Sequence, residues 1–293
     1  MAIDLDVHAH LVPVKPARLV NVPGVAWDHA AKTLVVDGHK VGLKALFDPA
    51  RLIAWMDEHA VRRALVSVPP PVYRQDLAEA DAFDWACYLN EELQAACTNS
   101  DGRLSPLFYL PMEHPGLHQA LLDLEASGRF AGFALAAGGH PAIEYSRSEH
   151  QPLWEALDRR TSFVFVHPGA CRDERLSRFY LENLVGNPYE TAVAAAHLVM
   201  AGVPSRYPAI RFCLAHAGGM FTSIVGRLQK GLDTSRPDVD PSMEPPLQAA
   251  RRFYVDGIAH HPTTLRAARD LFGEDKVLFG SDWPFPMGLQ KPE

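Results

Sequence analysis

Two histidines near the amino terminus have a spacing that suits metal binding. They lie in the segment Asp6-Val7-His8-Ala9-His10, at the end of the first apolar run. Because residues two apart on a β-strand point to the same face, both imidazoles would project together and could chelate one divalent ion. By itself the pair is also compatible with two polar side chains on a half-exposed strand.

Three more ionisable residues end apolar runs elsewhere in the chain. They are His167 after Ser162–Val166, His216 after Ile210–Ala215, and Asp282 shortly after Lys276–Gly280. Such groups are rarely placed at the end of an apolar run unless a partner satisfies them. In a barrel of parallel strands the carboxyl ends of all strands meet on one side, and active sites lie there. Taken together, these placements favour the metal interpretation.

The residue types indicate which chemistry the site would perform. His8, His10, His167 and Asp282 offer three imidazoles and a carboxylate, and zinc accepts such ligands while leaving a position open for water or substrate. His216 is then free to move protons at a metal-bound water, whose pKa the ion lowers to roughly 7. We expect one divalent metal ion, Zn²⁺ in the first place, with Mn²⁺, Fe²⁺ or Co²⁺ as alternatives.

A further histidine pair, His260-His261, follows the apolar run Phe253–Ile258. A helical pattern begins two residues after the pair. A helix-capping or loop position is therefore favoured for these histidines over an approach to the metal site.

Alternating strand and helix patterns predict a (β/α)₈ TIM barrel. Short apolar runs indicate parallel strands buried on both faces, and the stretches between them have helical spacing. No glycine-rich dinucleotide-binding turn is present, which favours a closed barrel over a doubly wound sheet. The expected strands are Ile3–Leu11, Arg63–Val68, Leu104–Leu110, Phe130–Ala137, Ser162–Val166, Ile210–Ala215, Phe253–Ile258 and Lys276–Gly280. The expected helices are Pro49–Ala60, Asp76–Cys97, Pro115–Ser127, His150–Arg159, Tyr189–Ala201, Gly219–Gly231 and Thr263–Leu271.

An insertion at about residues 20–45 separates the first two strands. Thr33–Val36 and His39–Val41 flank an Asp-Gly pair, which predicts a small hairpin rather than a second domain. We therefore expect a single domain over residues 1–293. Only eleven residues follow Asp282 and no helix pattern follows the eighth strand, so we expect the natural chain to continue beyond Glu293.

The composition narrows the classes of partner. With 28 basic and 35 acidic residues the formal net charge is −7, which argues against a nucleic-acid or anionic-membrane binder. An anionic substrate would have to be held by local arginines or lysines. No secretory signal or membrane-spanning run is visible, and the four cysteines form no C-x-x-C pair, so we expect a reduced, cytoplasmic protein.

The ordered set of motifs resembles the amidohydrolase superfamily, and within it the branch of the α-amino-β-carboxymuconate-ε-semialdehyde decarboxylases. The resemblance covers nearly the whole chain. The matching segments are Asp6–His10, Phe47–Pro49 to Met56-Asp57, Phe165–Pro168, Asn187–Thr191, Leu214–Gly219, Gly226-Arg227 and Gly280–Pro286.

This resemblance implies a role for several of the matching residues. It implies a barrel with one ion at the four ligands named above, with His216 as the catalytic histidine and Asp282 as a second proton carrier. Arg227 would hold a substrate carboxylate in the neighbouring subunit's site, which implies a homodimer, and Lys40 and Phe285 would contact the substrate. Gly169 departs from the pattern, because the decarboxylase has a tryptophan there, and the substrate is expected to differ accordingly.

We expect a metal-dependent decarboxylase, a carbon–carbon lyase, acting on a small unsaturated or aromatic carboxylic acid. The alternative on the same scaffold is a metal-dependent hydrolase of an amide, lactone or C–C bond, or a hydratase. A third interpretation is a non-catalytic barrel that keeps a metal for stability or binds a ligand. His216 argues against it, because a purely structural ion needs no extra group to move protons.

Overall fold

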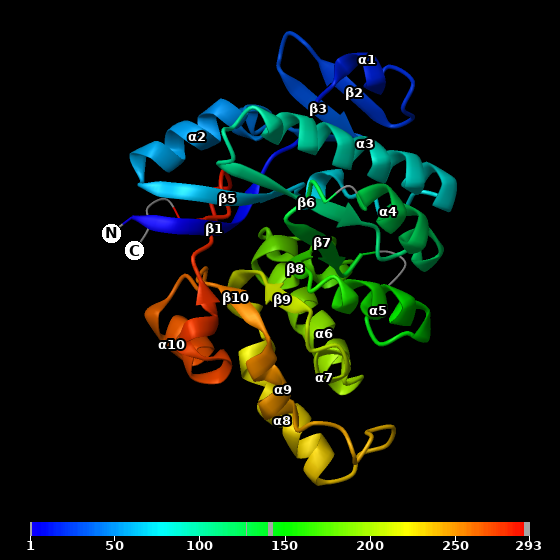
Figure 1. Ribbon diagram of the computed structural model, residues 1–293, viewed down its shortest axis with the longest axis vertical. Coiled ribbons are helices and arrows are strands. Elements are labelled where there is room, and N and C mark those ends of the chain that lie inside the picture. Colours follow the sequence, from blue (N-terminus) through cyan, green and yellow to red (C-terminus); the bar gives the residue numbers. More distant parts are fainter. Residues whose placement is uncertain (1, 127, 140–142, 290–293) are drawn as a thin grey trace.

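The structure is a computed structural model that describes residues 2–126, 128–139 and 143–289. Eight parallel strands form its main sheet, paired in the order β1-β5-β6-β7-β8-β9-β10-β11 (Figure 1). Each expected strand is present, and β8 runs two residues further than expected, so that it includes His167. The strands are β1 Ile3–His10, β5 Val61–Ser67, β6 Leu104–Leu110, β7 Gly132–Ala137, β8 Phe163–Pro168, β9 Arg211–Leu214, β10 Tyr254–Asp256 and β11 Val277–Leu278.

Main-chain hydrogen bonds between β1 and the segment from β11 onward close the sheet. The Val7 N–H donates to the Phe279 carbonyl at 2.9 Å, and the Asp282 N–H donates to the His8 carbonyl at 2.7 Å. Ala9 and Trp283 form a parallel bridge. The predicted TIM barrel is therefore confirmed, and its closure places Asp282 beside the histidines of β1.

Helices lie around the outside of the strands (Figure 1). Apolar side chains between these helices and the strands form the larger of two core clusters, while a smaller cluster that includes Val7 and Phe165 fills the barrel interior. The helix expected from Pro115 begins three residues later, because Pro115–Leu117 forms a 3₁₀ turn; Ser127 lies outside the described residues. The helices are α1 Pro16–Leu19, α2 Pro49–Glu58, α3 Glu79–Thr98, α4 His118–Glu125, α5 Gln151–Arg159, α6 Asn187–Met200, α7 Val203–Arg206, α8 Phe221–Asp233, α9 Pro246–Ala249 and α10 Pro262–Phe272.

The insertion after β1 is a three-stranded antiparallel sheet of β2 Val25–Asp28, β3 Thr33–Val36 and β4 His39–Val41. The hairpin of β3 and β4 agrees with the prediction, and its turn uses Asp37 and Gly38 in left-handed conformations. The sequence prediction missed β2, because Val25–Asp28 is too short to show a clear alternation. In Figure 1 this sheet lies beyond α3 at one end of the molecule, and α8 lies at the opposite end.

A β-bulge in β1 decides where the two histidines point. Asp6 pairs with Ala64 and Ala9 pairs with Val66, so three steps on β1 oppose two on β5. Val7 packs in the barrel interior, and without the bulge His8 would face the other side. The extra residue reverses the alternation, so that His8 contacts Phe165 inside the barrel, with ring centroids 4.7 Å apart.

The buried carboxylate of Asp6 holds the bulge and the closure together. Its Oδ1 accepts the main-chain N–H groups of His8 and Ser281 at 2.9 and 3.0 Å. Its Oδ2 accepts the Ser281 hydroxyl at 2.5 Å, and the Ser281 Oγ accepts the Trp283 N–H at 3.0 Å. One buried side-chain pair therefore links the first strand of the barrel to the segment that follows the last.

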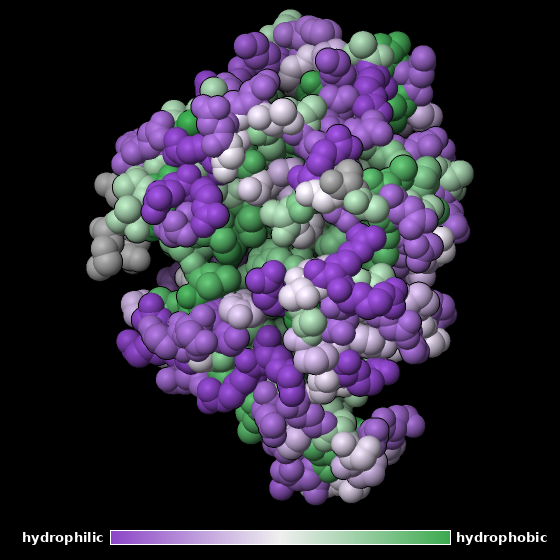
Figure 2. All heavy atoms as spheres, viewed as in Figure 1, coloured by the Kyte–Doolittle hydropathy of each residue, from purple (hydrophilic) through white to green (hydrophobic). Residues whose placement is uncertain are grey.

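The surface is mostly hydrophilic around the rim of the face shown in Figure 2, and hydrophobic residues gather in its hollowed centre. Among the described helices, none is long and apolar enough to cross a membrane.

Replacing Ser281 with Ala should destabilise the fold by about 1–3 kcal/mol, because it leaves a buried Asp6 oxygen without its donor. Urea-induced unfolding of the metal-loaded protein measures the change. Ser177→Ala, at an exposed position, serves as the control and should stay within about 0.5 kcal/mol of wild type. Equal stability of the two variants would contradict the role given to Ser281.

Candidate active site

A cavity of about 940 Å³ opens at the carboxyl ends of the strands. His167, His216 and Asp282 contribute to its wall, as expected for a barrel whose active site lies at this end. The wall also includes residues of the insertion sheet, so the cavity extends from the strand ends to the insertion.

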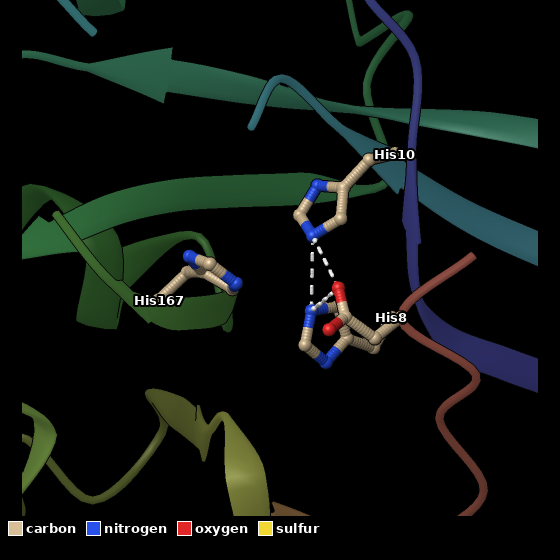
Figure 3. A group of neighbouring side chains, drawn as sticks. His8, His10 and His167 are labelled. Atoms are coloured by element: carbon tan, nitrogen blue, oxygen red, sulfur yellow. Dashed lines mark hydrogen bonds and ion pairs between the residues drawn. The ribbon is translucent and has the colours of Figure 1, made fainter. Parts of the chain in front are cut away.

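His8, His10, His167 and Asp282 come together although they lie far apart in the sequence. Each offers one ligand atom, and these atoms lie within 4.8 Å of one another, all in buried residues. His8 and His10 project from β1 toward the same space as His167 from β8 (Figure 3). The His8 and His10 Nε2 atoms are 3.0 Å apart, and Asp282 Oδ1 lies 3.3 and 3.2 Å from them.

The other ring nitrogen of each histidine has a partner outside the group. His8 Nδ1 lies 2.7 Å from Asp256 Oδ2, His10 Nδ1 lies 3.3 Å from the Ser67 carbonyl, and His167 Nδ1 lies 2.9 Å from the Pro168 carbonyl. Because carbonyl and carboxylate oxygens only accept hydrogen bonds, Nδ1 carries a proton in His8 and His167. His10 Nδ1 also lies 3.1 Å from the Ser67 hydroxyl. The Nε2 lone pairs are thereby directed at one another, which is how proteins orient metal-binding histidines.

Such a cluster fits a divalent metal ion. The His8 and His10 Nε2 atoms, only 3.0 Å apart, need a cation between them, which is either a proton on His8 or a metal ion. The buried Asp282 Oδ1 converges on the same point and has no hydrogen-bond partner among the described residues. Nitrogen and oxygen ligands of this kind suit zinc, manganese, iron and cobalt alike. The prediction of a divalent metal site is therefore supported.

The electrostatics of the group agree with a bound cation. Burial lowers the pKa of His8, but the carboxylates of Asp282 and Asp256 outweigh burial and raise this pKa to about 10. Burial holds the pKa of His10 and of His167 below the ordinary value, so both imidazoles are neutral and able to act as ligands. Burial acts to raise the pKa of Asp282, but the nearby imidazoles hold it well below its usual range. The group therefore favours positive charge at its centre.

His216 lies beside this group but outside it. Its Nε2 is 3.7 Å from Asp282 Oδ2, and its buried Nδ1 has no hydrogen-bond partner in the described part of the chain. His216 and Asp282 both adopt left-handed backbone conformations, with φ of 55° and 56°. Such conformations are uncommon outside glycine and concentrate at functional sites. The imidazole is left free to exchange a proton with a ligand in the cavity.

Asp256 positions both histidines, and the sequence analysis did not name it. Oδ2 accepts from His8 Nδ1 and from the His216 N–H at 2.9 Å, and Oδ1 accepts from the Ala217 and Ile258 N–H groups at 3.0 Å each. In the sequence Asp256 lies inside the expected run Phe253–Ile258, and only the observed strand β10 ends at this residue.

The predicted substrate-binding residues differ in where they lie. Phe285 lines the cavity, and its ring packs edge-on against His10 at 5.5 Å. Lys40 of β4 lines the mouth, is exposed, and forms no ion pair with the described residues. Arg227 of α8 is exposed and lies outside the cavity wall, although Thr222 and Ser223 of the same helix reach it.

The His260-His261 pair divides between two roles. His261 caps α10, with Nδ1 accepting from the Thr263 N–H at 3.2 Å, as the sequence favoured. His260 lines the cavity, which the sequence analysis had ranked second.

Gln75 explains why Gly169 follows the His-Pro of β8. A Cβ at Gly169 would lie 2.6 Å from Gln75 Oε1, and a Cβ at Gly139 would lie 2.2 Å from Gln75 Nε2. The Gln75 amide donates to the Gly138 carbonyl at 3.0 Å, which ties the loop after β5 to the loop after β7. A buried amide therefore fills the space beside Gly169, where a larger side chain has no room.

A family model described as amidohydrolase matches residues 5–293. The chain belongs to the amidohydrolase family. This amidohydrolase is 28% identical to 2-amino-3-carboxymuconate-6-semialdehyde decarboxylase of Dictyostelium discoideum, over 99% of this chain and 84% of the relative. It is 26% identical to gamma-resorcylate decarboxylase of Rhodococcus jostii, over 90% of this chain and 82% of that one.

Solved structures share the fold of this amidohydrolase. One is a dihydroxybenzoic acid decarboxylase of Polaromonas sp. JS666 with bound manganese and the inhibitor 2-nitroresorcinol, at a TM-score of 0.78 and 21% identity. The similarity covers 97% of this chain and 87% of that one. The resemblance to the amidohydrolases stated from the sequence is thus confirmed.

Replacing Asp256 with Asn should weaken metal binding roughly 10–100-fold, because the amide cannot accept from His8 and from three main-chain donors at once. Competition with a chelator measures the affinity. Asp270→Asn on the exposed side of α10 is the matched control and should bind metal as wild type does. Unchanged affinity in the Asp256 variant would show that His8 is oriented by other contacts.

Proposed function

We propose that this amidohydrolase is a metal-dependent decarboxylase of a small aromatic or unsaturated carboxylic acid. The observation that carries the proposal is the buried group of His8, His10, His167 and Asp282 at the cavity wall, with His216 adjoining it. The relatives named above are decarboxylases, which favours this reaction over the others that the fold supports.

The four ligand residues would hold one divalent ion, for which we propose Zn²⁺. When bound, the ion would supply a Lewis acid that polarises a substrate oxygen and lowers the pKa of a bound water. Manganese is bound in the Polaromonas relative, so Mn²⁺ is the main competitor. Elemental analysis of gently purified protein should find about one divalent ion per chain. A preparation that is free of such ions and cannot be loaded would contradict the site.

His216 and Asp282 are proposed to manage the proton that decarboxylation requires. Nε2 of His216 and Oδ2 of Asp282 lie 3.7 Å apart, longer than a hydrogen bond but close enough for both groups to reach one substrate atom between them. A proton passed from this pair to the substrate carbon allows the C–C bond to break. The bonding electrons stay on the carbon skeleton, the new C–H bond replaces the carboxylate, and carbon dioxide leaves.

The substrate carboxylate needs positive charge in a protein whose formal net charge is −7. We propose that Lys40 supplies part of it at the cavity mouth, while Phe285 packs against the substrate ring. Other cationic side chains at the mouth are engaged, because Arg74 pairs with Asp37 and Arg172 pairs with Asp76.

Arg227 is proposed to act in the site of a second copy of the chain, in a homodimer. It is exposed on α8 and forms no ion pair with the described residues. Large exposed apolar side chains gather before and at the start of α6, a helix that packs against α8, at Phe179, Tyr180, Leu184 and Tyr189. Surfaces of this kind commonly mark association sites.

The same residues would also serve a hydrolase or a hydratase, in which the activated water attacks a carbonyl or a double bond. The names of the relatives favour decarboxylation. A cytoplasmic location is proposed from the chemistry of the cysteines. All four lie in the described residues and are free, as in a reducing compartment.

Replacing His216 with Ala should lower turnover by roughly 10²–10⁴-fold while metal content stays the same, because His216 is not a ligand. Carbon dioxide release from a panel of aromatic acids measures turnover. His197→Ala on α6, outside the cavity wall, is the control and should retain activity. Full activity without His216 would overturn the proton role. A wild-type product with a new carboxylate or alcohol and no carbon dioxide would favour the alternative reaction.

Mixing two inactive variants tests the shared site. Arg227→Ala keeps its own His216, and His216→Ala keeps its own Arg227, so a mixed dimer regains one complete site. Equal amounts of the two should recover about a quarter of wild-type sites after subunit exchange. Light scattering should give about twice 32.3 kDa for each variant. A monomeric mass, or a dimer without recovery, would contradict the role given to Arg227.

A further inference from the structure

The hydroxyl of Tyr73 is buried without a hydrogen-bond partner among the described residues. The residue is only 3% exposed, yet it lines the cavity that holds His216 and Asp282. A buried hydroxyl with nothing to bond is destabilising, so a protein rarely keeps one unless a ligand or water satisfies it.

Neighbouring buried tyrosines behave differently. The Tyr145 hydroxyl donates to the Ala136 carbonyl at 2.8 Å, that of Tyr88 donates to the Pro13 carbonyl at 3.2 Å, and that of Tyr109 points to the Tyr73 carbonyl at 3.5 Å. Each of these three hydroxyls has a main-chain acceptor, whereas the hydroxyl of Tyr73, a residue that lines the cavity, has none among the described residues.

The ring of Tyr73 is held in place. It stacks on Tyr109 with centroids 4.9 Å apart and an interplanar angle of 12°. The main chain of Tyr109 is in turn fixed by Asn90, which donates to its carbonyl at 2.9 Å and accepts from its N–H at 2.7 Å. The 3₁₀ turn Pro70–Val72, which contains two prolines, restricts the chain directly before Tyr73. The hydroxyl therefore has a fixed position before any ligand arrives.

Gln75, two residues further along this wall, is already engaged. Gln75 Nε2 donates to the Gly138 carbonyl and Oε1 lies 3.4 Å from the Ala170 N–H. Burial raises the pKa of the Tyr73 hydroxyl, with the Asp282 and Glu113 charges adding to the effect, so the group stays protonated and able to donate.

We propose that the Tyr73 hydroxyl binds the substrate by donating a hydrogen bond to an oxygen substituent on its ring, and that it thereby selects hydroxylated acids over their methyl counterparts. The proposal rests on the proposed function, because the ligand is the same small aromatic carboxylic acid. We assign the substrate carboxylate to Lys40 and to the metal ligands. A neutral oxygen on the ring then remains as the acceptor for the neutral Tyr73 hydroxyl.

Equilibrium binding to metal-loaded protein tests this without requiring turnover. The ligands are benzoate, its three monohydroxy derivatives, and the three methyl derivatives with the same substitution pattern. Wild type should bind at least one hydroxy acid about tenfold more tightly than its methyl counterpart. Tyr73→Phe keeps the stacked ring, so it should lose this preference while its affinity for benzoate and its metal content stay the same.

A stability measurement separates this role from a structural one. Tyr73→Phe removes an unsatisfied group, so its thermal midpoint should equal or exceed that of wild type. Tyr145→Phe, the matched control, removes a satisfied hydroxyl, so it should lower the midpoint and keep the ligand preference.

Three results would overturn the proposal: an unchanged preference in Tyr73→Phe, a fall in its thermal midpoint as large as that of Tyr145→Phe, or no binding of any of the acids by wild type. Carbon dioxide release is followed separately. Binding with the expected preference but without decarboxylation would refute the proposed function and leave the role of Tyr73 intact.

Discussion

The structure depends most on the wholly buried carboxylate of Asp256. Burial acts to raise its pKa, but the hydrogen bond from His8 and the other contacts outweigh burial and hold the pKa below the ordinary value. The carboxylate therefore stays charged inside the barrel, where an uncompensated charge would be very costly. Its donors come from β1 and from the turns after β9 and β10, so satisfying this one charge aligns three segments of the barrel.

The buried Asp256 also constrains the main chain that packs against it. Gly280 has no room for a side chain, because a Cβ there would lie 2.7 Å from the Asp256 Cβ and 2.9 Å from the His8 Cβ. The close approach of β11 lets Asp282 reach the metal group from a left-handed conformation. Asp6 accepts the His8 N–H and thereby stabilises the bulge in β1. The bulge turns His8 toward the barrel interior. Two buried carboxylates thus position the ligands without belonging to the ligand group.

The fold and the metal group were predictable from the sequence because both depend on a local pattern. Apolar runs ending in His167, His216 and Asp282 identify strand ends, and a parallel barrel brings strand ends together. Asp256 lies inside the expected run Phe253–Ile258, so its position did not mark it, and its role became clear only from its hydrogen bonds. The bulge in β1 was not predictable either. The spacing of His8 and His10 is that of a regular strand, and the bulge shows only because Val7 and His8, which are adjacent, both face the barrel interior. The space taken by Gln75 beside Gly169 depends on two loops far apart in the sequence.

A single arginine, Arg74, ties the insertion sheet to the barrel. Arg74, directly after the wall residue Tyr73, donates to both oxygens of Asp37 at 2.9 Å and to the Pro23 carbonyl at 2.7 Å. Its side chain is only 6% exposed and stacks over the Trp85 ring at 5.3 Å, so it is committed to holding the insertion against the barrel. Because Asp37 neutralises Arg74, the positive charge that remains unpaired at this side of the mouth is Lys40, three residues along the same hairpin. The contacts of Arg74 therefore fix the hairpin that carries Lys40 at the cavity wall.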